Sequence, residues 1–199
     1  MRLRIFDALE ARLRLVRSVG DDYIFCRPNA DNSQDLPGNP AILHYDLWNE
    51  VTSRLSQSRP FRCPAIFVEF FPVTWSPLQR NAVHADFTLR LHIVTATLAP
   101  SDTQFRSEAL ARLRLVRAVK AALADFSAAP DDCGRSFSRF KYLGSTTDHN
   151  HEQICEDIEE WQTHCIDCSG IDEGLILTPK NVTLDTGDIF ADAFGEEIV

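Results

Sequence analysis

The chain has 199 residues, of which 44% are hydrophobic and 25% are charged, and its formal net charge is −9. This length and composition are typical of a soluble protein with one substantial core, or at most two small ones. The negative charge argues against a general nucleic-acid-binding protein, because phosphate contact needs a positive surface. No apolar run reaches the roughly 18 residues of a membrane span, and the N-terminal residues show no apolar signal region, which argues against secretion. We therefore interpret the six cysteines as reduced thiols.

The first predicted element is a helix over residues 3–19. Its apolar side chains recur at helical spacing: Ile5, Leu9, Leu13 and Val16. Residues 28–40 are rich in Pro, Gly, Asn and Asp, which indicates a loop. The next stretch, residues 41–55, fits neither a helix nor a strand clearly.

Two strands are predicted after this loop. Residues 64–71 are β-branched and aromatic with apolar side chains on both faces, as expected of a central strand. Residues 87–93 alternate between apolar and polar side chains, which indicates a half-buried strand. The two stretches predict an antiparallel pair.

A second helix is predicted over residues 104–126. It contains ARLRLVRAV at 111–119, which matches ARLRLVRSV at 11–19 in eight of nine positions. The flanking residues do not match, so a domain duplication is not supported. Arg12 and Arg112 fall inside the apolar arc of each helix, where an arginine can snorkel, face a subunit interface or pair with a carboxylate such as Glu69.

The last elements are a strand over 137–143 and a segment over 151–167 whose type stays open. Within this segment, Ile154, Ile158, Trp161 and Cys165 form a helical stripe. The preceding strand needs a partner, and this favours a strand instead. The elements together predict an α+β fold: a mostly antiparallel sheet with two amphipathic helices packed on one face, in the order α-β-β-α-β-β.

Residues 171–199 differ in composition from the rest of the chain. Seven acids stand against one lysine there, so the segment carries −6 of the −9. It is also too apolar for a purely disordered tail. We expect a single domain over residues 1–170 and an acidic extension over 171–199, which packs on its own domain or on a neighbouring copy.

The stretch 147–168 holds the residues that could bind a metal. His149 and His151 form one close pair and Cys165 and Cys168 form another, so the four could bind zinc. No second Cys-x-x-Cys supports this site, and we interpret the acids of CEDIEEW, residues 155–161, as a solvated face. The sequence contains no phosphate loop, no nucleophile elbow and no coherent active site. We therefore expect no enzyme and no catalytic, cofactor-binding or metal residues, with a zinc-binding cytoplasmic protein as the alternative.

Three phrases resemble the tail terminator, or tail-completion, proteins of long-tailed phages and prophages. They are Pro64–Phe70, Leu89–Thr95 and Asp148–Glu152, the last of which leads into an acidic alternation up to Ile166. The resemblance covers roughly residues 1–168 and excludes the long loop and the acidic tail. It implies that residues 151–167 form the final strand.

The resemblance also implies a function. Such proteins are small subunits that assemble as a ring, commonly a hexamer, which caps the tail tube and meets the head-completion protein. The implied partners are other copies of the chain, the tail-tube protein and the head-completion protein, without membrane or sequence-specific nucleic acid. The implied location is the host cytoplasm during assembly and then the virion. Trp48, Trp75, Arg12 and Arg112 would then be interface residues.

Overall fold

The computed structural model describes the chain except for residues 28–34, 50–60, 79–81, 97–101, 149–153 and 170–199. The described residues form two helices and ten strands. In chain order these are α1 Arg2–Leu13, β1 Val16–Val19, β2 Asp22–Phe25, β3 Asn39–Pro40, β4 His44–Leu47, β5 Ala65–Phe70, β6 Ser76–Pro77, β7 Val83–Ala96, α2 Asp102–Leu123, β8 Ser136–Phe137, β9 Lys141–Asp148 and β10 Ile154–Asp167. Neither helix has the length and apolarity needed to cross a membrane.

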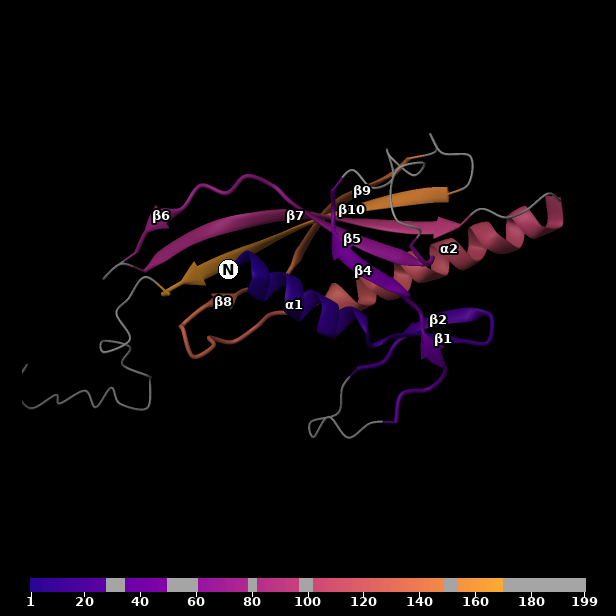
Figure 1. Ribbon diagram of the computed structural model, residues 1–199, viewed down its shortest axis with the longest axis horizontal. Coiled ribbons are helices and arrows are strands. Elements are labelled where there is room, and N and C mark those ends of the chain that lie inside the picture. The colour runs from indigo at the N-terminus through magenta and orange to yellow at the C-terminus, as the bar shows by residue number, and fades with distance from the viewer. Residues whose placement is uncertain (28–34, 50–60, 79–81, 97–101, 149–153, 170–199) are drawn as a thin grey trace, which may run out of the picture.

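The main sheet is organised by two long central strands. β7 and β10 have 14 residues each and pair antiparallel along their whole length, from Val83 opposite Asp167 to Ala96 opposite Ile154. The sheet runs β4-β5-β7-β10-β8, with β6 added to β7 and β9 added to β10. β4 and β5 are parallel, and the other pairs are antiparallel. A second sheet, β2-β1-β3, lies beside the C-terminal end of α1 (Figure 1).

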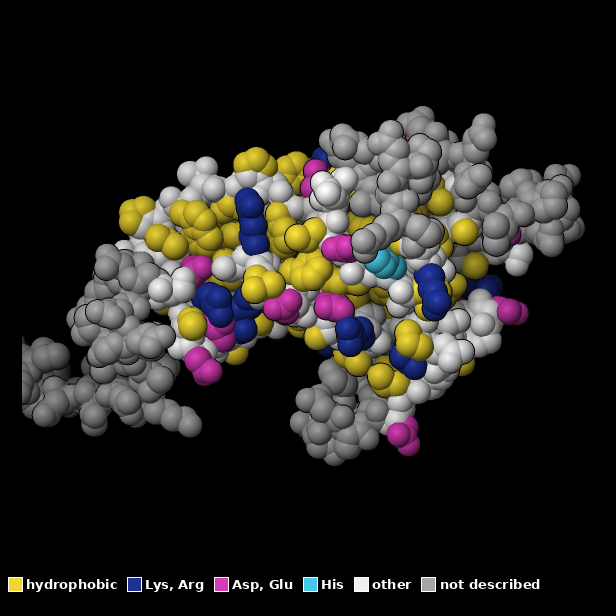
Figure 2. Space-filling view, in the orientation of Figure 1, with side chains coloured by type: hydrophobic (Ala, Val, Ile, Leu, Met, Phe, Trp, Pro, Cys, Tyr) yellow, Lys and Arg dark blue, Asp and Glu magenta, His cyan; other side chains and the backbone are white. Residues whose placement is uncertain are grey.

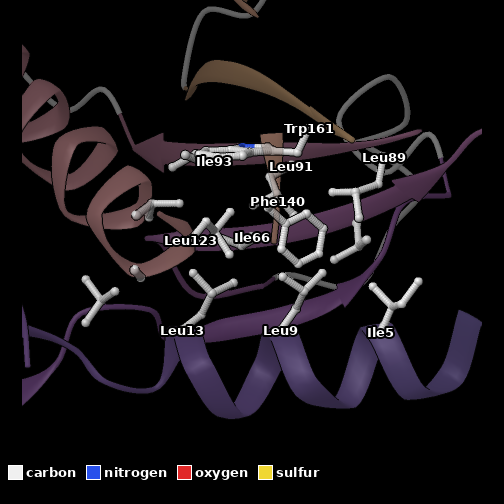
Figure 3. Packing of buried hydrophobic residues seen from close by; sticks show 14 of the residues in the cluster. Ile5, Leu9, Leu13, Ile66, Leu89, Leu91, Ile93, Leu123, Phe140 and Trp161 are labelled. Atoms are coloured by element: carbon white, nitrogen blue, oxygen red, sulfur yellow. The ribbon is translucent and has the colours of Figure 1, made fainter. Parts of the chain in front are cut away.

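Both helices cover the same face of the main sheet. Alternate residues of β7, including Phe87, Leu89 and Leu91, point to this face and join one buried cluster with α1 and α2. Figure 3 shows Ile5, Leu9 and Leu13 of α1 pointing up from the helix toward these strands. Each fully buried aliphatic side chain of this kind contributes about 1.5–3 kcal/mol. The layer of helices on sheet is therefore the principal core.

The predicted fold class and element order are wrong. In place of α-β-β-α-β-β, the chain is mostly β, with ten strands in two sheets and two helices among the described residues. The additional strands have two to four residues each, too short to show a hydrophobic period. The expected strand at 137–143 is two strands, β8 and β9. The open segment 151–167 is a strand over its described part, β10, as the resemblance implied.

The matching nine-residue stretches fold differently. Residues 111–119 lie wholly within α2. Residues 11–19 begin in α1, which ends at Leu13, and finish as strand β1, paired with both β2 and β3. The surrounding chain, which supplies these pairing strands, therefore decides the structure of this sequence. The expected acidic extension lies outside the described residues, and the division at residue 170 stays a prediction.

Candidate functional site

Strand β10 carries acidic side chains on both faces of the sheet, and three acids in its first half are buried. These are Glu156, Asp157 and Glu159. The interpretation of this stretch as a solvated face is wrong, because β10 lies inside the sheet with β7 on one side and β8 and β9 on the other. A buried carboxylate is costly unless it is paired. Each of the three acids lies within ion-pairing distance of a basic side chain from another element.

On the face of the sheet away from the helices, the buried imidazole of His92 lies between two glutamates. Its Nδ1 is 2.5 Å from Glu156 Oε1, and its Nε2 is 3.2 Å from Glu69 Oε2. Trp48 stacks on the same imidazole, with ring centroids 3.8 Å apart and planes inclined by 2°. Both ring nitrogens can donate to the two carboxylates only in the imidazolium form. The three side chains come from β5, β7 and β10 and link these strands.

Arg90 extends this network along the same face. Its Nε is 3.2 Å from Glu160 Oε2, and one of its terminal nitrogens is 3.8 Å from Glu69 Oε2. The guanidinium lies 4.5 Å from the ring centre of Phe71. Glu69 therefore pairs with Arg90 and His92. The expectation that it pairs with Arg12 or Arg112 is wrong, because Glu69 points away from the helices.

The helix-covered face holds a second set of pairs. Arg112 Nε lies 3.3 Å from Asp157 Oδ2, and the same guanidinium contacts Cys155. Lys120 Nζ lies 3.3 Å from Glu159 Oε2 and donates a hydrogen bond of 2.8 Å to the Tyr142 hydroxyl. Burial raises the pKa of the Glu159 carboxyl, although Lys120 opposes this effect. These pairs fix α2 over β10.

The partly buried guanidinium of Arg12 is held by a backbone carbonyl and two aromatic rings instead of a carboxylate. Its Nε donates to the Ala122 carbonyl at 2.7 Å, and its guanidinium lies 4.4 Å and 5.0 Å from the ring centres of Phe25 and Phe126. Burial lowers the pKa of this guanidinium. Arg12 and Arg112 are therefore internal positioning contacts between elements. Trp48 likewise packs inside the chain, whereas Trp75 is partly exposed.

The four proposed zinc ligands are not brought together. Cys165 is fully buried near the far end of β10, and Cys168 follows that strand. His149 and His151 lie outside the described residues and precede Ile154, the first residue of β10. The eleven residues from Ile154 to Cys165 span about 36 Å of strand. The three residues from His151 to Ile154 can reach back over only about 10 Å of this distance. A zinc site with all four residues of one chain is therefore impossible, and the described residues contain no metal-competent group of three or more His, Cys, Asp or Glu side chains.

Cys165 is expected to be an unreactive thiol in the folded protein. Burial raises its pKa to about 12, so its thiolate fraction at pH 8 is about a thousandfold below that of a free cysteine. Alkylation followed by peptide mass spectrometry should show slow modification of Cys165 and faster modification of the more accessible Cys168. Denaturant should remove the difference. Equal rates in the folded protein would contradict the buried placement.

The first half of α2 forms a helical arm, one face of which the described residues leave exposed. It extends past the ends of β7 and β10 (Figure 1), and none of its residues from 106 to 114 is buried. Leu110 and Leu113 are 44% and 55% exposed. From Leu115 onward the apolar residues of α2 enter the core. The arm therefore presents apolar side chains that a second molecule could cover.

Sequence reasoning missed the His92 network and the arm. The signal for His92 was its position on the polar face of the alternation over 87–93, but its partners Glu69 and Glu156 are diagonal neighbours on the adjacent strands, which the sequence could not show. For the arm, the helical pattern indicated amphipathicity but could not show where the sheet ends beneath α2.

No family model matches the chain, and no curated protein is similar to it in sequence. Among solved structures, the chain is similar to one from "Virion of native gene transfer agent (GTA) particle", at 10% identity and a TM-score of 0.40. The match covers 62% of this chain and 78% of that chain. A likeness of this extent carries no argument about the function of this chain.

Proposed function

We propose that this chain is a non-enzymatic structural subunit of a phage or prophage tail. It assembles as a ring, caps the finished tail tube and meets the head-completion protein. The three phrases that resemble tail terminators support this proposal, because they belong to neighbouring strands. Pro64–Phe70 contains β5, Leu89–Thr95 lies in β7, and Asp148–Glu152 connects β9 with β10.

The exposed arm of α2 is the observation that carries the proposal. A monomer gains nothing from leucines exposed on the surface of a projecting helix, whereas an assembling subunit buries them against a neighbour. The chain exposes further large apolar residues on other elements, and Figure 2 shows a broad band of hydrophobic side chains across one face. The large apolar residues that are exposed outside the two helices include Leu43, Leu47, Trp75 and Leu78.

The free edge of the main sheet offers a second contact surface. β9 is exposed on both faces along most of its length and pairs, among the described residues, with β10 alone. Its register shifts opposite Glu160 and Trp161, which leaves Leu143 as the extra residue of a β-bulge. Such an edge can pair with another chain or be blunted by its bulge. The buried charges, in contrast, are engaged with each other and serve the interior of the subunit.

The proposal predicts that the full chain forms discrete oligomers and binds one end of isolated tail tubes. Replacing Leu110 and Leu113 together with serine should raise the dissociation constant of the oligomer about a hundredfold, because two leucine side chains lose their burial. Sedimentation velocity over a concentration series measures the oligomer, and electron microscopy shows the tube ends. Leu3→Ser, at a residue 69% exposed on α1, is the control. Wild-type protein that stays monomeric and ignores tail tubes would refute the proposal.

A further inference from the structure

The arm of α2 presents one continuous stripe with a defined chemistry. Arg106, Leu110, Leu113 and Arg117 follow each other at helical spacing and fall within an arc of about 60°. The stripe is about 16 Å long, with two exposed leucines between two exposed arginines. Within the described part of the chain, Arg117 forms only a solvent-exposed pair with Asp22, at 3.3 Å. An occupant should therefore be acidic and carry large apolar side chains.

The chain contains a segment of this chemistry. Residues 188–197 read DIFADAFGEE, with four acids and no basic residue. The acids alternate with three large apolar side chains, Ile189, Phe190 and Phe194. We infer that this segment of one copy binds the Arg106–Arg117 stripe of a neighbouring copy. The inference rests on the proposed assembly and names the contact that holds neighbouring copies together.

The geometry of the chain favours a neighbouring copy over the same copy. Arg112 contacts Cys155, so the arm lies at the start of β10, whereas the described chain leaves the sheet at Ser169, beyond the end of that strand. Fourteen residues of extended chain separate the two points, or about 46 Å. A random coil of 18 residues, the number between Ser169 and Asp188, has a root-mean-square length of only about 25 Å.

Binding within one copy would thus stretch the linker to nearly twice its relaxed length. A neighbour whose arm faces the end of β10 avoids this stretching. The contact joins the arm of one copy to the acidic segment of another, which are two different surfaces. Repeating it therefore arranges the copies head-to-tail, and such an arrangement can close into a ring.

A charge exchange in the full-length chain tests the inference. One variant carries Arg106→Glu and Arg117→Glu, and the other carries Asp188→Lys and Asp192→Lys. Each alone should weaken assembly about tenfold or more, since like charges then face each other. An equimolar mixture should assemble again, because lysine segments meet glutamate arms and aspartate segments meet arginine arms. Sedimentation velocity measures all three samples.

Controls separate this contact from general charge effects and from the proposed function. Arg14→Glu with Arg139→Glu makes the same charge change at two other exposed arginines and should leave assembly unchanged. Circular dichroism should show every variant folded. If the wild type assembles and the arm variant assembles equally well, the inferred contact is overturned and the proposed assembly is not. Variants that weaken assembly without rescue in the mixture also overturn it, since binding between copies requires that rescue. A monomeric wild type instead refutes the proposed assembly.

Discussion

Replacing Glu156 with alanine is expected to lower the free energy of unfolding by about 3–5 kcal/mol. The substitution removes the acceptor 2.5 Å from His92 Nδ1, and the imidazole is too buried to find water in its place. Urea unfolding followed by tryptophan fluorescence measures the change, and Trp48, which stacks on His92, reports on the site directly. The effect is large because the remaining partner stays in the interior with an unmatched polar group.

Glu160→Ala is the matched control. Glu160 lies on the same face of the same strand, but its side chain is 34% exposed and pairs with Arg90, which is also partly exposed. Water can replace such a pair, so the expected loss is below about 1 kcal/mol. A loss at Glu156 no larger than this would mean that the His92 network contributes little to stability.

The double variant His92→Leu with Glu156→Leu separates pairing from packing. It removes both buried partners, and Glu69 still has a charged partner because Arg90 lies 3.8 Å away. Most of the stability lost in Glu156→Ala should therefore return, since a buried ion pair can often be replaced by apolar side chains without loss. A double variant as unstable as the single one would assign the cost to packing around Trp48.

The sequence was most informative where one local pattern decides the structure. The alternation over 87–93 correctly predicts β7, and the spacing of Leu9 and Leu13 correctly predicts α1, although the helix predicted as far as residue 19 ends at Leu13 and gives way to β1. It was least informative for β10, where Ile154 and Trp161 share a helical stripe but point to opposite faces of the sheet. Because β10 is covered on both faces, acids replace the expected polar–apolar alternation, and only their partners on distant elements make this pattern stable.

The His92 site illustrates the same limit. Its members come from β5, β7 and β10, separated by 23 and 64 residues along the chain. Each is an ordinary polar residue in its local context, and the pairing exists only once the strand register aligns Glu69 with Arg90 and Ile158 with His92. The zinc site considered from the sequence does not form, for the converse reason. Its residues are close in sequence, and a fully extended strand separates them in space.

Replacing Leu9 with alanine is expected to lower the free energy of unfolding by about 2–5 kcal/mol. Leu9 is 0% exposed and lies in the middle of the α1 face that packs against the sheet, between Ile5 and Leu13 (Figure 3). The smaller side chain loses its burial and leaves a cavity, because both neighbours are anchored by their own contacts. Alanine keeps the helix itself, so the loss reports packing alone.

Leu3→Ala makes the identical chemical change on the same helix at a residue 69% exposed, and it should alter the free energy of unfolding by less than about 0.5 kcal/mol. The difference between the two variants in urea unfolding therefore measures how firmly α1 is held against β7. Equal effects would show that α1 is loosely attached. In that case the helix layer could not hold the sheet rigid beneath α2, and the projecting arm would lack the fixed base that a contact between copies requires.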